Sequence, residues 1–322
     1  MTLKVRQKHE LKVPRNVVYA CMVNVDYENV KKRALNQNGR KKREGRYTTA
    51  GVDSLLSIDG HDKLMGYQNS TFPIAVYGML DQASRKILIL RCWTTNSNPD
   101  VVGHWYLELL KESKILPGSM RCDRGTETGK LVTIHGYLRA QVGDLTDPVD
   151  SIIYGTSTTN QIERWWRELH ERLEKNIKKD LNALLAENLY NPHDQIDRDL
   201  LAFIMVPCVQ RELDEFKDIV WNTHRIRRQK HTLLPDGIPN HIYQFPEKYD
   251  LQQCGFQLTE EQITEVEAEA ELGNGISDFL TEEMREACES VVPYPGEVPF
   301  NHFRTAYLHL RSTLKDRLNN EN

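Results

Sequence analysis

The stretch Leu-Leu-Ser-Ile-Asp-Gly-His-Asp-Lys, residues 55–63, holds the first element of the predicted fold. Its apolar run stops at Asp59-Gly60, which predicts a short buried strand that brings Asp59 to its carboxyl-terminal end. Asp-Gly also favours a tight turn, so a plain turn-forming role for Asp59 stays open. The segments that follow bear on the choice between these two interpretations.

Strand-like and helical patterns follow this stretch in turn. The expected order is a hairpin, a helix, a strand and, beyond a loop, one more strand, at residues 72–93, 101–114, 120–123 and 151–154. The third of these segments ends at Asp123, which is a second aspartate placed directly after an apolar strand. A turn in Asp-x-Gly is again the alternative for Asp123.

A long amphipathic helix is predicted from Asn160 onward. Apolar residues recur there every three or four positions with charges between them, namely Trp166, Leu169, Leu173, Ile177, Leu181 and Leu185. Glu163 lies in the first turn of this helix. There it could be a ligand, or it could only complement the helix dipole and close a capping box with Thr159 or Asn160.

These elements predict an α/β domain, a mixed sheet covered by helices. The chain has 322 residues and a net charge of -4, but residues 1–50 hold 13 Lys/Arg against 4 Asp/Glu and residues 251–322 hold 5 against 14. We therefore expect three parts: a basic, partly helical segment over 1–50, a core over 51–232 and a mainly helical, acidic extension over 233–322.

The basic residues predict contact with nucleic acid, although a solvated surface is the plain alternative. The candidates for phosphate contact are Lys41, Lys42, Arg43, Arg164, Arg167, Arg225, Arg227 and Arg228. Trp165 and Trp166 could stack on a base, but one of two adjacent aromatics on such a helix is usually part of the core.

Several classes of protein are not supported by the sequence. The six cysteines form no CxxC pair or His/Cys array, so zinc is not expected. No Walker A loop, dinucleotide fingerprint or Gly-x-Ser-x-Gly elbow is present. The chain has no apolar run near 18 residues and no signal-peptide pattern, which predicts an intracellular protein.

Asp59, Asp123 and Glu163 together match one kind of site. Two aspartates at the ends of strands and a glutamate at the start of a helix supply carboxylate oxygens, which are the ligands that Mg²⁺ prefers. Asp62 and Glu127 are close enough in sequence to compete for a ligand role, and we rank them second because residues three or four beyond a strand end normally point elsewhere.

At these segments the chain resembles the integrase core of retroviral integrases and DDE transposases, which has a ribonuclease H-like fold. It is most similar to the integrase-core proteins found as transposon-derived genes in animals. The matching stretches are residues 57–69, 93–97, 121–129, 153–169, 213–228 and 238–249. Residues 8–25 resemble the last part of a helix-turn-helix module, whose earlier helices are not expected in this chain.

The resemblance implies a DDE triad of Asp59, Asp123 and Glu163 that binds two Mg²⁺ or Mn²⁺ ions and acts on DNA. It also implies a nuclear protein that self-associates. The expected activity is that of a polynucleotidyl transferase in DNA integration or transposition. The alternatives are a domesticated, catalytically silent core that binds DNA or chromatin and offers its acidic tail to a protein partner, and a decayed gene product without a present role.

Overall fold

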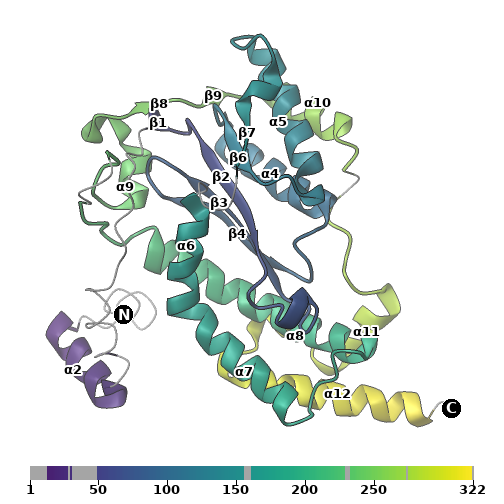
Figure 1. Cartoon of the computed structure of the whole chain (residues 1–322). Coiled ribbons are helices and arrows are strands. Elements are labelled where there is room, and N and C mark those ends of the chain that lie inside the picture. The colour runs from purple at the N-terminus through teal and green to yellow at the C-terminus, as the bar shows by residue number, and fades with distance from the viewer. Residues whose placement is uncertain are drawn as a thin grey trace.

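A five-stranded mixed sheet lies between two layers of helices in the computed structural model (Figure 1), which describes residues 13–27, 30, 49–155, 161–228, 233–272 and 275–320. The strands are β2 (Leu56–His61), β3 (Ala75–Asp81), β4 (Ile87–Trp93), β6 (Met120–Cys122) and β7 (Ile152–Tyr154). Their order across the sheet is β4-β3-β2-β6-β7. The hairpin pairs β2, β3 and β4 are antiparallel, whereas β2, β6 and β7 run parallel. This is the mixed sheet of a ribonuclease H-like α/β fold, as predicted.

β2 ends two residues later than the sequence predicts. The expected strand ends at Asp59, but the antiparallel pairing with β3 continues through Gly60 opposite Tyr77 and His61 opposite Val76. The long partner strand β3 supplies hydrogen bonds for these two residues, so the Asp-Gly pair does not turn the chain. Asp59 therefore lies inside the strand, and the turn interpretation of this residue is wrong.

One face of the sheet is covered by a continuous helical arm and by a long buried helix. The arm consists of α6 (Gln161–Leu169), a π turn (His170–Glu174) and α7 (Lys175–Ala186), and the buried helix α8 (Gln195–Glu215) continues into a second π turn (Phe216–Trp221). The predicted helix from Asn160 is confirmed from Gln161 onward. Its apolar stripe packs with alternate strand residues such as Val76 and Leu80 in one hydrophobic cluster.

The opposite face of the sheet is covered by α4 (Pro99–Ser113) and α5 (Gly129–Val142). Ile58, Met79 and Ile89 point into this second cluster. α5 occupies part of the segment where the sequence pattern predicts a loop, so that prediction is wrong. Its inner face carries the buried polar residues His135 and Arg139 among its apolar ones, which hides the helical period from a hydrophobicity pattern.

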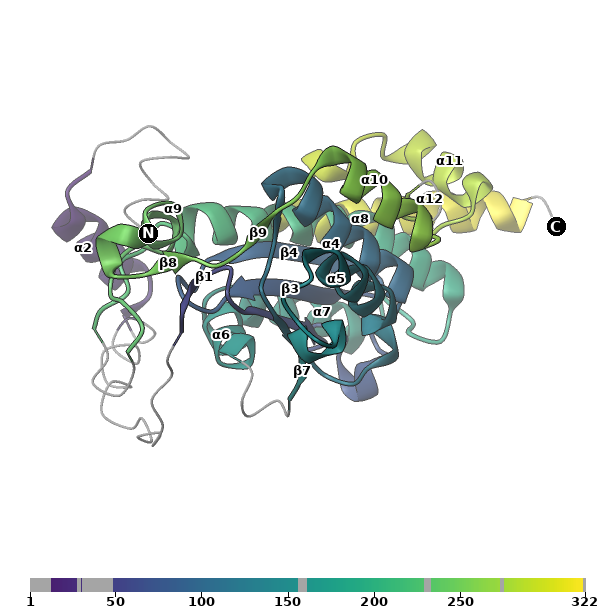
Figure 2. The same ribbon diagram turned by 90° about the horizontal axis from the view of Figure 1, so that it is seen from above.

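The C-terminal segment runs back along the edge of the core. β8 (Gln252–Gln253) pairs with β1 (Gly51–Val52), and β9 (Phe256–Gln257) pairs with β5 (Ile115–Leu116). Further helices are α2 (Arg15–Val25), α9 (Pro239–Gln244), α10 (Glu260–Glu269), α11 (Glu282–Val291) and α12 (Phe303–Asn320). Short 3-10 turns lie at Tyr67–Asn69, Thr126–Thr128, Pro148–Ser151, Pro246–Tyr249, Pro295–Glu297 and Phe300–His302. Figure 2 shows α10 on the α4 and α5 side and α12 beside α8.

The acidic C-terminal helices are bound to the core by ion pairs. Glu260 and Glu267 of α10 pair with Lys114 and Lys111, each at 2.7–2.8 Å. On the other side of the molecule, α12 packs on α8 and its Arg311 Nε lies 2.7 Å from the buried carboxylate of Asp197. Part of the acidic charge is thus neutralised within the molecule. The domain boundaries expected at residues 50 and 232 stay predictions.

Candidate active site

Asp59 faces the layer that contains α6. Because Ile58 points into the α4 and α5 layer, the alternation of side chains along β2 turns Asp59 to the other face. Trp166 of α6 donates its Nε1 hydrogen to Asp59 Oδ2 at 2.8 Å. β6 pairs with β2 only as far as Ser57 opposite Arg121. Asp59 therefore lies just beyond the point where the neighbouring parallel strand ends.

Asp123 follows β6 directly, as the sequence predicts. Since β2 and β6 are parallel neighbours, the chain after Cys122 leaves the sheet beside Asp59. Asp123 Oδ1 is buried and has no hydrogen-bond partner among the described residues. A buried carboxylate oxygen without a donor is costly, and a bound cation is one way in which proteins satisfy it.

Glu163 lies in the first turn of α6, also as predicted. The position of this helix depends on Gly78 of β3, which is the register partner of Asp59. A Cβ atom at Gly78 would lie 2.7 Å from Trp166 Cη2 and 3.1 Å from Ile162 Cδ1. Only glycine lets α6 approach the sheet this closely, and the close approach brings Glu163 to Asp59.

The electrostatics of Asp59 show that the three carboxyl groups lie near one another. The pKa of Asp59 is raised to about 8, first by burial and next by the negative charge of Glu163; the hydrogen bond from Trp166 has a smaller, opposite effect. The carboxyl groups of Asp59 and Glu163 are within hydrogen-bonding reach of each other, and the charge of Asp123 also acts on Asp59. The structure thus brings together the three acidic residues that the sequence pattern indicates.

The donor chemistry of these residues fits a divalent cation. Carboxylate oxygens are the ligands that Mg²⁺ and Mn²⁺ prefer, and the unpartnered Oδ1 of Asp123 is available as a ligand. Across the described parts of the chain, however, no group of three or more His, Cys, Asp or Glu side chains is arranged as a ready metal-binding cluster. The carboxyl groups of Asp59 and Glu163 are arranged to share a proton in a hydrogen bond, and a bound cation would displace that proton.

The two carboxylates ranked second have different surroundings. Asp62 accepts a hydrogen bond from Asn69 on the exposed loop between β2 and β3. Glu127 lies in the 3-10 turn after Asp123, and its charge raises the pKa of the buried Tyr77 hydroxyl, after the larger effect of burial. The charges of Asp59 and Asp123 also raise the pKa of the Tyr77 hydroxyl, so Glu127 lies within electrostatic range of the same hydroxyl as these two aspartates.

Three residues that surround Asp59 were not predicted from the sequence. Trp166 is buried like Trp165, as a core interpretation predicts, but it also binds the Asp59 carboxylate. His61 stacks on Trp166, and Glu174 binds His61. The signal that could have found Glu174 is a glutamate within the apolar stripe of the long helix. For His61, the one signal in the sequence is its position two residues after Asp59.

The structure describes five of the eight basic residues that were predicted to contact phosphate. Three of them lie outside the described residues, namely Lys41, Lys42 and Arg43. Arg164 and Arg167 are exposed on α6, two turns or less from Glu163. These two predicted phosphate contacts therefore lie on the same helix as Glu163.

Arg225, Arg227 and Arg228 form a second basic segment, which follows the second π turn. The pKa of the neighbouring His224 is lowered, first by burial and also by the charge of Arg172 in the first π turn, so this segment begins within electrostatic range of the helical arm. Arg225, Arg227 and Arg228 are exposed, and Arg225 lies 3.7 Å from Asp236. One of the three positive charges is thus partly neutralised.

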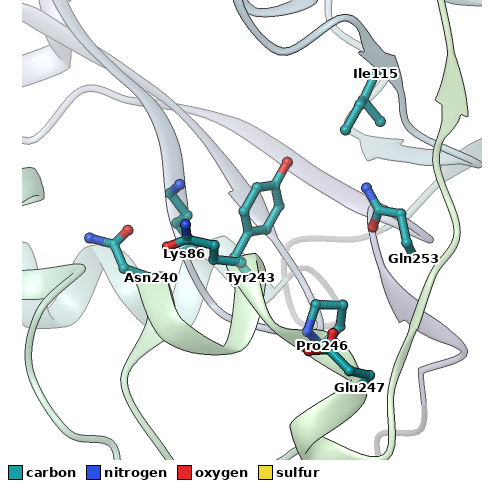
Figure 3. Close-up of a pocket in the computed structure, with 8 residues that line it drawn as sticks. Lys86, Ile115, Asn240, Tyr243, Pro246, Glu247 and Gln253 are labelled. Carbon is teal, nitrogen blue, oxygen red and sulfur yellow. The ribbon is translucent and has the colours of Figure 1, made fainter.

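Two of the cavities on the described surface lie near residues of interest. The smaller, of about 400 Å³, adjoins Asp123 and is lined by Arg124, Gly125, Thr128, Gly129, Val132 and Tyr154. The larger, of about 770 Å³, lies by α9 and β8, and Figure 3 shows Tyr243 between Lys86 and Gln253 in it. Tyr243 and Gln253 both donate to the buried Asp53 carboxylate. The smaller cavity begins one residue after Asp123, although none of the three site carboxylates lines it.

Fold and site together define a ribonuclease H-like core in which two strands and a helix present acidic residues to one another. The chain belongs to the integrase core domain family, whose family model matches residues 46–243. No curated protein and no solved structure matches the chain. Within the described residues, no helix is long and apolar enough to cross a membrane.

Membership of this family places the chain in the polynucleotidyl transferase superfamily. Integrase core proteins generally use divalent metal ions, and integrase-type domains bind DNA. These are properties of the family, and they direct the proposals that follow.

Proposed function

We propose that this protein is a metal-dependent polynucleotidyl transferase that cleaves and joins DNA phosphodiesters, with Asp59, Asp123 and Glu163 as its catalytic carboxylates. The observation that carries the proposal is the convergence of these three residues, from β2, β6 and α6, on one face of the sheet. The unpartnered oxygen of Asp123 and the close approach of Glu163 to Asp59 are the features that a cation site requires.

In this mechanism the three carboxylates would hold two Mg²⁺ or Mn²⁺ ions. When bound, such ions would activate an attacking water or 3′-hydroxyl oxygen and stabilise the charge on the leaving oxygen. Asp59 must lose its proton before it can act as a ligand, because its pKa is raised to about 8. Arg164 and Arg167 would bind backbone phosphates next to the site and fix the position of the strand.

The test compares Asp123→Asn with Asp62→Asn in the full chain. Both changes remove one negative charge, but Asp62 lies on the exposed loop and bonds to Asn69. We expect Asp123→Asn to lose stoichiometric Mn²⁺ binding in calorimetric titration and to lose Mn²⁺-dependent nicking of plasmid DNA, while Asp62→Asn keeps both. Equal behaviour of the two variants would disprove the assignment of the site.

The second candidate function is DNA binding without catalysis. One observation favours it: the described residues contain no ready metal-binding cluster. In that case the wild-type protein binds DNA at low salt with no Mn²⁺ titration signal, and Asp123→Asn binds DNA equally well. Self-association and a nuclear location stay predictions, and light scattering of the purified protein measures the first.

A further inference from the structure

Trp166 links the candidate site to a buried polar group that catalysis does not use. Its indole N–H is 2.8 Å from Asp59 Oδ2, and its ring stacks on the imidazole of His61 with centroids 4.5 Å apart and an interplanar angle of 13°. Trp166 is 3% exposed and His61 is 7% exposed. The indole plane is therefore fixed on one side by His61, and its orientation sets the direction of the N–H group.

Glu174 holds the other side of His61. His61 Nε2 is 2.9 Å from Glu174 Oε2, and because a carboxylate oxygen accepts, the imidazole donates its Nε2 hydrogen. His170 Nδ1 lies 3.2 Å from the same oxygen. Glu174 is fully buried, and its Oε1 has no hydrogen-bond partner in the described part of the chain. A leucine would pack here without the cost of a buried, half-satisfied carboxylate.

The π turn at His170–Glu174 is what brings Glu174 to the sheet. Eight residues separate Trp166 from Glu174, and in a regular α-helix eight steps of about 100° would turn the two side chains about 80° apart. A π turn adds roughly one residue to the turn, so both side chains face the sheet. π turns are rare in proteins and are frequent at functional sites, which supports a functional reason for this one.

We propose that His61 and Glu174 are positioning residues, which hold the Trp166 indole so that its N–H fixes the Asp59 carboxylate at Oδ2 and leaves Oδ1 for the cation. This inference rests on the proposed function. Hydrogen-bond partners of metal ligands orient those ligands, and their removal typically costs about ten- to a hundredfold in metal affinity.

The first experiment compares Trp166→Phe with Trp165→Phe. Both variants lose the same ring volume from one buried cluster, but Trp165 Nε1 has no partner among the described residues, so only Trp166→Phe removes a hydrogen bond. We expect Mn²⁺ affinity, measured by calorimetric titration, to fall about ten- to a hundredfold in Trp166→Phe and less than about twofold in Trp165→Phe. Equal effects would overturn the proposal.

The second experiment asks whether Glu174 acts through its hydrogen bond or through its volume. Glu174→Gln keeps an oxygen that accepts from His61, whereas Glu174→Leu fills similar space without an acceptor. We expect Glu174→Leu to weaken Mn²⁺ binding as much as Trp166→Phe does. Glu174→Gln should retain most of the wild-type Mn²⁺ affinity, with the two Glu174 variants compared at equal thermal midpoints. Weak binding in both variants, or in neither, would contradict a positioning role.

A metal-independent measurement separates this proposal from the proposed function. The indole ¹H–¹⁵N signal of Trp166, assigned by its loss in Trp166→Phe, should shift in Asp59→Asn and in Glu174→Leu without any Mn²⁺ present. If wild-type protein binds no Mn²⁺ but the indole signal shifts in both variants, the network holds Asp59 and the proposed function is wrong. If the signal stays in place in both variants, the positioning network itself is disproved.

Discussion

Gly78→Ala should displace the helix that carries Glu163. The added Cβ would lie 2.7 Å from Trp166 Cη2 and 3.1 Å from Ile162 Cδ1, where ordinary contacts between carbon atoms are about 3.5–4.0 Å. α6 must therefore move by roughly 1 Å away from β3, or the Trp166 ring must leave its position. Overpacking of this size in a core costs about 1–3 kcal/mol, which lowers the thermal midpoint by roughly 2–4 °C per kcal/mol in a domain of about 200 residues.

The functional loss should exceed the loss of stability. A displacement of about 1 Å at a catalytic group can lower the rate about a hundredfold, since the carboxylates must meet at one point. Differential scanning calorimetry measures the loss of stability, and Mn²⁺ titration together with Mn²⁺-dependent nicking of plasmid DNA measures the loss of function in the same preparation. Gly136→Ala is the matched control, because a Cβ at this position of α5 meets nothing within 4 Å. A Gly78→Ala protein with unchanged midpoint and unchanged Mn²⁺ affinity would refute the close packing of α6 on the sheet.

Three other measurements test separate parts of the structure. The pKa of Asp59 is raised to about 8, so Mn²⁺ affinity should fall about tenfold per pH unit below pH 8, because the proton competes with the cation. In the metal-free protein the same proton stabilises the fold at low pH, and this stability is lost as the pH rises through 8. An Mn²⁺ affinity that stays constant between pH 6 and pH 8 would contradict the raised pKa. Asp197→Ala should cost about 2–3 kcal/mol of unfolding free energy, because it leaves Arg311 unpaired. Burial raises the pKa of Asp197, but the hydrogen bonds from Arg311 and Lys315 outweigh it and the pKa is lowered, so this stability is present at neutral pH and is lost in acid. Denaturant titrations at pH 7 and pH 3 should therefore show a smaller difference between variant and wild type at pH 3. Arg164→Ala with Arg167→Ala should weaken DNA binding and reduce the salt slope of log Kd by up to about 2, one unit for each phosphate that the variant no longer binds, and an unchanged slope would remove α6 from the DNA interface.

The local sequence is sufficient for the elements whose apolar pattern is unbroken. The hairpin of β3 and β4, which is buried on both faces, was predictable from its nearly continuous apolar runs. The long arm that begins at α6 was predictable because its apolar residues follow the period of a helix. α5 was not predictable in this way, since His135 and Arg139 occupy buried positions through partners elsewhere in the chain. His135 accepts or donates a hydrogen bond with Tyr106 at 2.8 Å, and the Arg139 guanidinium lies 4.4 Å from the ring centroid of Phe256.

At Asp59 the local sequence predicts a turn that the tertiary structure does not form. Asp-Gly favours a turn when only neighbouring residues are considered, and the strand continues here because the partner strand β3 offers hydrogen bonds at Tyr77. A tertiary hydrogen bond outweighs a local preference of a few tenths of a kcal/mol up to about 1 kcal/mol.

Residue types and their order were enough to single out Asp59, Asp123 and Glu163 as candidates, because an acidic residue that ends an apolar run or opens a helix leaves a local signature in the chain. Their role in the site stays a prediction. Their convergence depends on contacts that no local pattern contains: the parallel pairing of β2 with β6 and the absence of a side chain at Gly78. The physical reason is distance along the chain, since Asp59 and Trp166 are 107 residues apart and only the packed sheet and helix bring them within 2.8 Å.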